Sequence, residues 1–169
     1  MTPEAPLVQI TAFRLREHVE PRDRSKLFTL INDGGFFYPH EMAYGMNLFD
    51  EHLLKGENSS YQFMLYEETD HILACGCFGL LPLTNQRYHL HWFAVASAYH
   101  GQGIGQKLEA AITARIRLMG GIKIYADTSN RGFHTRARKF YENCGYRQCS
   151  IIPDYFGDGD DKVLFTKDL

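Results

Sequence analysis

The alternation of apolar and polar residues divides the first half of the chain into short strands and two helices. Apolar residues recur at every second position in the strand-like segments and at every three or four positions in the helical ones. Pro39 starts the second helical segment, where its missing N–H group costs no helical hydrogen bond. The pattern predicts a strand over Leu7–Arg16, helices over Arg22–Ile31 and His40–Leu54, and strands over Tyr61–Tyr66, Ile72–Leu80 and Tyr88–Val95. Polar turns separate the last three strands, so we expect them to pair as an antiparallel meander.

A helical segment opens the second half of the chain. Leu108, Ala111 and Ile112 recur at three- and four-residue intervals, and Gly120 with the glycine after it ends the segment. A helix that crosses between two neighbouring strands makes them parallel, so the short strand expected at Ile122–Ala126 runs parallel to its predecessor. The rest of the pattern predicts a helix over His134–Cys144 and strands over Tyr146–Ile152 and Val163–Thr166. We therefore expect an α/β fold, a mixed sheet with helices on its faces.

Composition and charge narrow the classes of protein to which the chain can belong. Its 169 residues are 44% hydrophobic and 14% aromatic, which suits a packed core, and we expect one domain over residues 1–169. The formal net charge of −2 offers no basic field for nucleic acid, and no apolar run is long enough to span a membrane. Met1–Pro6 lacks the charged and apolar pattern of a signal sequence. We therefore expect a cytoplasmic protein that binds neither nucleic acid nor a membrane.

Neither the cysteines nor the histidines have the spacing of a metal site. His89 and His91 are spaced H-x-H on a strand, and His100 does not complete a set of ligands at suitable spacing. Four cysteines form no C-x-x-C pair and are expected to be buried thiols: Cys75, Cys77, Cys144 and Cys149. We therefore expect no bound metal.

The strongest candidate for chemistry is a run with glycines at alternate positions, between a strand-like segment and a helical one. Gly101, Gly103 and Gly105 let the backbone approach a ligand closely, and the start of the following helix offers free N–H groups to phosphate oxygens. Gln106 stands where both a nucleoside triphosphate loop and a dinucleotide fingerprint need a glycine. Asp127, about twenty residues further on, is the one feature that suits a dinucleotide. The run predicts a pyrophosphate site that fits neither of these two classes.

The spacing of this loop resembles the pyrophosphate loop of the GNAT acetyltransferases, Q/R-x-x-G-x-G/A. His100 stands in the Q/R place, ahead of Gly103 and Gly105. A second segment, Ala137–Tyr146, is similar to the family's A-x-x-F-Y-x-x-x-G-[FY] motif and follows roughly forty residues later. The likeness extends over about Tyr61–Leu169, and the last part of the chain resembles a bacterial GNAT subgroup whose acceptor we cannot name.

The resemblance implies a GNAT-like acyl-CoA N-acyltransferase fold. This fold is a mostly antiparallel, twisted sheet flanked by helices, with a splayed pair of parallel strands at the coenzyme site. It also implies acetyl-CoA as cosubstrate and a primary amine of a small molecule or peptide as acceptor. His100 departs from the family pattern, because a histidine lacks the constant positive charge that an arginine offers to phosphate. The implied coenzyme-binding residues are Phe93, Ala94, Val95, His100, Gly101, Gln102, Gly103, Ile104, Gly105 and Tyr141.

Tyr141 and two histidines are the candidates for moving protons. By spacing alone Tyr141 is a core residue on the apolar face of its helix, whereas the resemblance makes it the general acid that protonates the coenzyme sulfur. Strict alternation along the strand places His89 and His91 on one face with Phe93 and Val95. An imidazole is a base near neutral pH, so His89 is the preferred proton acceptor and His91 the second choice. The other interpretation is that both are polar residues facing solvent. Backbone N–H groups near Val95 are the expected oxyanion donors.

Two segments are candidates for binding the acceptor amine. Asp154–Asp161 gathers four carboxylates and two aromatic rings in a glycine-rich loop, which either attracts a cation or is a solvated turn. The aromatic and polar cluster that begins with Phe36 walls the acceptor site in the resembling fold, or it belongs to the edge of the core. The candidate acceptor residues are Phe37, Glu41, Asp154, Tyr155, Phe156 and Asp158.

We interpret the chain as a single-domain N-acetyltransferase that works by direct attack of the amine on acetyl-CoA. No basic partner is identified that would make Cys144 a covalent carrier of the acetyl group. The alternative is a sensor or interaction module that binds coenzyme A without turnover, and the presence of Tyr141 favours the enzyme. A homodimer is a possible assembly.

Overall fold

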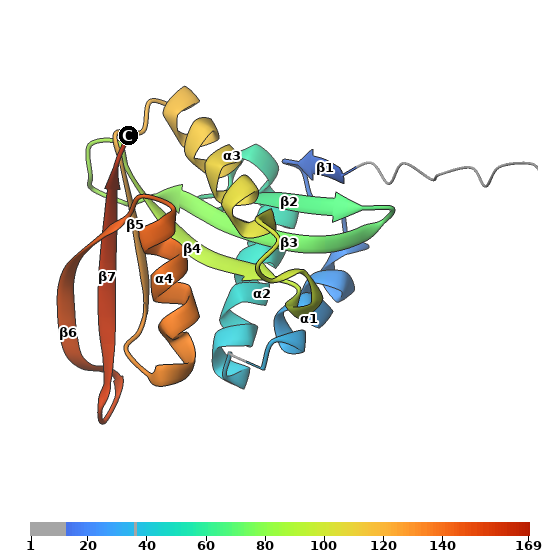
Figure 1. Cartoon of the computed structure of the whole chain (residues 1–169). Coiled ribbons are helices and arrows are strands. Elements are labelled where there is room, and N and C mark those ends of the chain that lie inside the picture. The colour runs from blue at the N-terminus through green and yellow to red at the C-terminus, as the bar shows by residue number, and fades with distance from the viewer. Residues whose placement is uncertain (1–12, 36) are drawn as a thin grey trace, which may run out of the picture.

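Seven strands form one twisted sheet in the order β1-β2-β3-β4-β5-β7-β6 (Figure 1). The computed structural model describes residues 13–35 and 37–169 of the chain. The strands are β1 (Phe13–Arg16), β2 (Gln62–Glu68), β3 (His71–Leu80), β4 (Arg87–Val95), β5 (Lys123–Ser129), β6 (Arg147–Gly157) and β7 (Asp160–Asp168). The helices are α1 (Asp23–Asp33), α2 (Pro39–Lys55), α3 (Ile104–Leu118) and α4 (Thr135–Asn143), with 3₁₀ turns at η1 (Gly56–Asn58), η2 (Ser97–Tyr99) and η3 (Gly132–His134). This is the predicted mixed α/β architecture.

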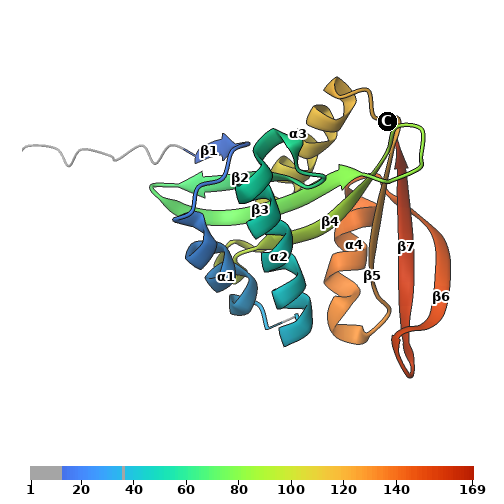
Figure 2. The ribbon, with the colours of Figure 1, turned by 180° about the vertical axis from the view of Figure 1, so that it is seen from behind.

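Helices cover both faces of the sheet. α1 and α2 lie on one face and α3 and α4 on the other, as two opposite views show (Figures 1 and 2). On the first face, a cluster that we call the α1/α2 core buries Leu27 and Phe49 of the helices with Leu65 of β2. On the second face, the α3/α4 core buries Leu108 and Ile112 of α3. Among the described residues, no helix is long and apolar enough to cross a membrane.

The predicted antiparallel meander is confirmed for the strands from β1 to β4. Each of these strands pairs antiparallel with the next one. The ends of β2, β3 and β4 and of the helices α1, α2 and α4 lie within two residues of their predicted positions. The part of the first predicted strand from Leu7 to Ala12 lies outside the described residues.

β4 and β5 run parallel but stay together only at their starts. Their pairing runs from Arg87 with Lys123 to Leu90 with Ala126. Beyond this point β5 stays paired with β7, while β4 continues beside β3 as far as Val95. Figure 1 shows the two strands diverging. This is the splayed parallel pair that the resemblance implies at the coenzyme site.

A β-bulge in β4 changes the face on which its later side chains lie. Leu90 pairs with Phe78 and Trp92 pairs with Cys77, so His91 is an extra residue in β4. Before the bulge Leu90 enters the α3/α4 core, whereas after it Trp92 enters the α1/α2 core. The even-numbered side chains therefore change face at the bulge.

The prediction that His89 and His91 share a face with Phe93 and Val95 is therefore wrong. Phe93 and Val95 pack against the α3/α4 core. The ring of His91 lies against Tyr61, which packs on the α1/α2 core, and the Nδ1 atoms of His89 and His91 are 3.1 Å apart. Strict alternation cannot foresee this arrangement, because one extra residue reverses the facing of every side chain after it.

The predicted loop at Asp154–Asp161 is largely part of a β-hairpin. The strands that the sequence ends at Ile152 and restarts at Val163 continue toward each other in β6 and β7, with an irregular register between them. The carboxylate of Asp154 accepts a hydrogen bond from the N–H group of Gly159 at 2.7 Å. A carboxylate that bonds to nearby backbone in this way stabilises a turn. In the sequence alone, the acidic composition of the segment indicates a loop.

The prediction of buried thiols is correct for two of the four cysteines. Cys75 and Cys77 are buried in the α1/α2 core. Cys144 is half-buried and Cys149 is exposed. Cys149 lies on β6, an edge strand whose side chains are exposed along almost its whole length.

Candidate active site

The predicted pyrophosphate loop, His100–Gly105, which we call the glycine loop, follows η2 and runs into the first turn of α3. It lies just after β4 has left β5. Gly101 and Gly103 have φ angles of 75° and 79°, a conformation that glycine adopts without strain. A Cβ atom at either position would meet no atom within 4 Å, so open space lies over the loop. The first N–H groups of an α-helix have no partner within the helix, and here they belong to the turn that begins at Ile104. The loop has the room and the donors that a pyrophosphate group needs.

Gly105 allows α3 to pack closely against α4 and the end of β4. A Cβ atom there would lie 3.0 Å from the Phe140 ring and 3.2 Å from Val95. The rings of Phe93 and Phe140 are in turn 4.9 Å apart between centroids, whereas Ala94 packs against the α1/α2 core. α3 and α4 therefore hold the end of β4 in place. Because β5 has left this part of β4, one backbone edge of the segment is open to a ligand.

Tyr141 lies in the α3/α4 core, as its helical spacing predicts. The residue is 7% exposed, and its ring centroid is 5.4 Å from that of Phe165 and 5.5 Å from that of Tyr146. Burial, and secondarily the negative charge of Asp127, raises the pKa of Tyr141 above its ordinary value. The hydroxyl therefore keeps its proton at neutral pH, which is the state that a general acid requires.

His89 is held between two side chains on the side of the sheet that carries α1 and α2. Its Nε2 atom is 2.7 Å from Oδ1 of Asp127, and its Nδ1 atom faces Nδ1 of His91 at 3.1 Å. Asp127 comes from β5, just beyond the point where β5 leaves β4. The ammonium group of Lys162, on β7, lies 3.3 Å from the same carboxylate oxygen. The structure thus joins both predicted histidines to a carboxylate and a cation.

The charges in this group follow from burial and from its ion pairs. Burial, and then the neighbouring His89, lowers the pKa of His91 to about 4, so this ring is neutral at pH 7. Burial by itself would raise the pKa of Asp127, but His89 and Lys162 lower it below its ordinary value. Asp127 is therefore an ionised acceptor, and it favours the tautomer of neutral His89 with hydrogen on Nε2.

The contact between Asp127 and His89 is not foreseen from the sequence, in which Asp127 stands out only as a dinucleotide ligand. The signal that could have found it is the period of a strand. His89 pairs with Tyr125, and a residue two positions further along β5 lies on the same face. The register that makes this comparison possible is known only once the sheet is known.

A small pocket at the N-terminus of α2 joins parts of both predicted acceptor segments. Its volume is about 180 Å³, and it is lined by Tyr38, His40, Glu41, Arg131, Phe156 and Asp160. Arg131 is paired with Asp160 at 3.0 Å and donates a hydrogen bond to the Tyr38 hydroxyl. The carboxylate of Glu41 accepts a hydrogen bond from the N–H group of Tyr38 at 2.7 Å. The pocket therefore offers charges of both signs beside the aromatic ring of Phe156.

The other predicted acceptor residues do not line this pocket. Phe37 packs on Trp92, with 5.2 Å between the ring centroids. The ring of Tyr155 lies 4.4 Å from the ammonium nitrogen of Lys162. Asp154 bonds within its own hairpin and Asp158 is exposed near the hairpin turn, while Phe36 lies outside the described residues. The structure thus brings Glu41 and Phe156 together and leaves the rest apart.

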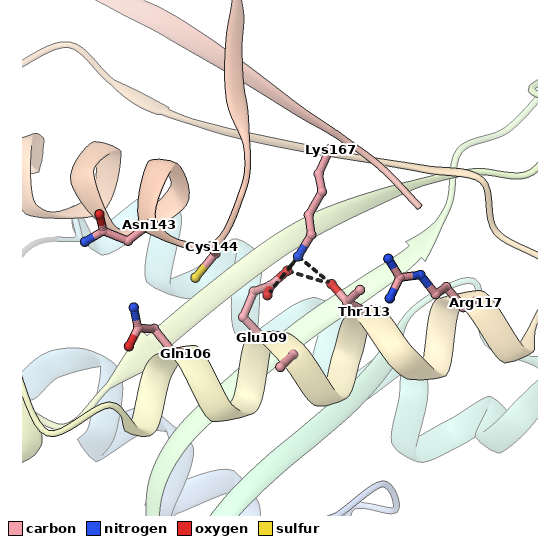
Figure 3. A pocket seen from close by; sticks show the side chains of 8 residues that line it. Gln106, Glu109, Thr113, Arg117, Asn143, Cys144 and Lys167 are labelled. Atoms are coloured by element: carbon pink, nitrogen blue, oxygen red, sulfur yellow. Dashed lines mark hydrogen bonds and ion pairs between the residues drawn. The ribbon is translucent and has the colours of Figure 1, made fainter.

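A larger hollow of about 320 Å³ lies between α3, the end of α4 and β7 (Figure 3). The buried carboxylate of Glu109 accepts hydrogen bonds there from Lys167 at 2.9 Å and from Thr113 at 2.7 Å. The Tyr146 hydroxyl donates a further bond to it at 3.0 Å. These bonds join α3 to β7, and none of the predicted site residues lines the hollow. We therefore interpret it as a structural groove and not as part of the candidate active site.

A glycine loop at a helix N-terminus beside a splayed parallel strand pair is the arrangement that the resemblance to the GNAT acetyltransferases implies. The sequence model of the acetyltransferase (GNAT) family matches residues 24–146, which is well over half of the chain. The chain therefore belongs to the acetyltransferase (GNAT) family, and it is an acyltransferase.

Individual relatives agree with this family. A GNAT-family protein from Desulfovibrio desulfuricans is 32% identical, and the match covers 93% of this chain and 99% of that one with a TM-score of 0.90. The [ribosomal protein bS18]-alanine N-acetyltransferase of Haemophilus ducreyi is 27% identical over 104 residues, 62% of this chain and 68% of that protein. A Salmonella typhimurium protein solved with its cofactor acetyl-CoA has a TM-score of 0.71 at 16% identity, over 94% of both chains. This last likeness shows the fold.

Proposed function

We propose that this protein is an acetyl-CoA-dependent N-acetyltransferase that transfers the acetyl group to a primary amine of a small molecule or peptide by direct attack. The observation that carries the proposal is that three candidate residues lie near the gap between β4 and β5. His89 and Asp127 bond to each other where the two strands separate, and Tyr141, in the α3/α4 core, is close enough to Asp127 for that charge to raise the pKa of its hydroxyl. A thioester held in the gap would have a proton donor on one side and a proton acceptor on the other.

In this proposal the coenzyme lies along the glycine loop and the open edge of β4. The backbone of His100–Gly105 holds the pyrophosphate, supported by the open space over Gly101 and Gly103. The backbone of Phe93–Val95 holds the pantetheine arm, and N–H groups near Val95 stabilise the oxyanion. Bound acetyl-CoA supplies a thioester that is activated toward attack by an amine.

The proton that the attacking amine loses is proposed to pass along a chain of three side chains. Ionised Asp127 accepts the Nε2–H of His89, which leaves a lone pair on Nδ1 of His89 facing His91. Neutral His91 then donates its Nδ1–H to His89 and keeps a lone pair on Nε2. A proton that arrives at His91 is passed on to His89, where Asp127 stabilises the imidazolium. His89 is thus the final proton acceptor, and Asp127 is its positioning residue.

The departing coenzyme needs a proton on its sulfur, and we assign this proton to the hydroxyl of Tyr141. The transfer goes directly from coenzyme to amine and not through a thiol of the protein. Burial, and then the charge of Glu109, raises the pKa of Cys144 to about 12. A thiol that stays un-ionised at neutral pH is a poor nucleophile, which supports direct attack.

The acceptor is proposed to bind in the pocket at the N-terminus of α2. Glu41 and Asp160 provide negative charges that suit an ammonium group, and Phe156 provides an apolar wall. The exposed Asp158 would extend the same acidic surface on the hairpin. The Haemophilus ducreyi relative is named for an alanine of a ribosomal protein, which supports a peptide amine as one acceptor class.

The release of free coenzyme A, measured in the steady state over a panel of amines and peptides, tests the proposal. We expect turnover with at least one amine. The signal from the exposed thiol of Cys149 is subtracted with a blank that contains the protein alone. Tyr141→Phe keeps the ring and lacks the hydroxyl, so kcat should fall by about 100-fold at saturating acetyl-CoA. Coenzyme binding without turnover on any amine would favour the sensor alternative. Unchanged turnover in Tyr141→Phe would leave Tyr141 with a packing role only.

A further inference from the structure

His100 makes two hydrogen bonds that leave its ring without a positive charge. Its Nε2 atom is 2.8 Å from the carbonyl oxygen of Val95, and because a carbonyl only accepts, Nε2 carries a hydrogen. Its Nδ1 atom is 2.5 Å from Nη1 of Arg136, and because a guanidinium only donates, Nδ1 holds a lone pair. The ring is therefore neutral. The position that carries Q or R in the family pattern contributes no charge here.

Arg136 brings a permanent positive charge to the same place from a different element. It is the second residue of α4, it is exposed, and its side chain reaches the first residue of the glycine loop. A guanidinium stays charged at any working pH, and its planar set of five N–H donors matches phosphate oxygens. We infer that Arg136 binds the pyrophosphate of coenzyme A and so replaces the charge that the loop lacks at His100. This inference rests on the proposed use of acetyl-CoA.

Two other charged groups near the loop have partners of their own. Arg138, two residues further along α4, donates to the carbonyl oxygens of Ser129 and Arg131. Asp33 lies on the other side, where its carboxylate accepts hydrogen bonds from both the N–H and the hydroxyl of Ser97. These bonds lower the pKa of Asp33, so a negative charge stands beside the loop. An anionic ligand in this position needs a nearby cation to offset the repulsion.

Calorimetric titration with coenzyme A tests the assignment without any acceptor. Arg136→Gln should weaken binding by about tenfold at low salt, and the difference should shrink at high salt because an exposed ion pair is screened. Arg136→Lys should fall in between, since an ammonium keeps the charge but lacks the planar fork. The matched control is Arg147→Gln, which should leave the affinity unchanged. It removes another exposed arginine, which lies at the start of β6 and is paired with Asp168.

Two further titrations identify the cause of the loss and the phosphate involved. His100→Arg added to Arg136→Gln should restore most of the affinity, because a permanent charge then stands on the loop itself. Dephospho-coenzyme A, which lacks the 3′-phosphate, should show the same ratio between wild type and Arg136→Gln as coenzyme A does.

Three results would overturn the inference. These are equal affinities of wild type and Arg136→Gln, a loss that His100→Arg does not restore, and a loss that disappears with dephospho-coenzyme A. The last result would assign Arg136 to the 3′-phosphate. A wild-type protein that binds no coenzyme A would refute the proposed function itself, and the inference with it.

Discussion

At the scale of single residues, the protonation state of each group at the site is set by partners from other strands. His91 is neutral because it is buried next to His89, and Asp127 is ionised because His89 and Lys162 outweigh the effect of burial. In the proposed reaction, His89 must be neutral before it can accept a proton.

Asp127→Asn should lower kcat/KM by about 100-fold. The carboxylate bonds to Nε2 of His89, and an amide in its place cannot offset the charge of the imidazolium that forms during the reaction. The measurement is kcat/KM at neutral pH with an acceptor from the amine panel.

The control for this prediction is Asp70→Asn, which removes an exposed carboxylate in the turn between β2 and β3 and should leave kcat/KM unchanged. If Asp127 had only a structural role, its replacement would lower thermal stability without lowering the kcat/KM of the folded protein. A kcat/KM equal to that of the wild type would leave solvent water as the proton acceptor.

The sequence predicts single residues of the site where their role depends on the local chain. Gly101 and Gly103 belong to a motif of a few residues, and the burial of Tyr141 follows from its helical period. The contact between His89 and Asp127 joins two strands separated by a helix, and the register of those strands is set by packing across the whole sheet. No local pattern carries that information.

At the scale of elements, the glycine loop fixes where α3 begins relative to β4 and α4. Gly103→Asp should weaken coenzyme A binding by at least about tenfold, whereas Gly103→Asn should weaken it far less. Both variants place a side chain at a φ of 79°, which asparagine tolerates better than most residues. They have similar shapes, so their difference reports mainly the repulsion between a carboxylate and the pyrophosphate. Calorimetry on both variants measures it, and equal losses would mean backbone strain alone.

The helices and the meander are predictable because local signals mark them. Pro39 starts α2, the glycine at 120 ends α3, and the apolar period identifies the buried face of each helix. The bulge at His91 and the continuation of β6 through Asp154 are not predictable in this way. Both arise from pairing with a neighbouring strand, which the sequence of one strand does not encode.

At the scale of the whole molecule, a buried ionic cluster ties the N-terminal elements to the sheet. The guanidinium of Arg16 on β1 donates to Asp23 of α1 at 2.7 and 2.9 Å and to Glu67 of β2 at 2.9 Å. Burial alone would raise the pKa of both carboxyl groups, but the bonds from Arg16 bring each pKa below its ordinary value. The cluster therefore stabilises the fold only while its carboxylates are ionised.

Asp23→Asn should lower the free energy of unfolding at pH 7 by about 3 to 5 kcal/mol, because it leaves Arg16 buried with an incomplete set of partners. In the wild type, Asp23 and Glu67 bind protons more weakly in the folded state than in the unfolded state. Their stabilisation is complete well above pH 4 and is lost as the pH falls through their lowered pKa values. The variant lacks one of the two carboxylates, so its deficit relative to the wild type should shrink in acid.

Urea unfolding followed by circular dichroism, at neutral pH and in steps down to about pH 3, measures this deficit. His91 also destabilises the fold as the pH falls from 6.5 toward its lowered pKa of about 4, but it does so equally in both proteins and cancels from the difference. Asp50→Asn is the matched control, because it breaks an exposed pair with Arg24 and should change the unfolding midpoint little at any pH. A deficit in Asp23→Asn that stayed constant down to about pH 3 would contradict the prediction, since it would arise from lost packing and not from the charge of Asp23.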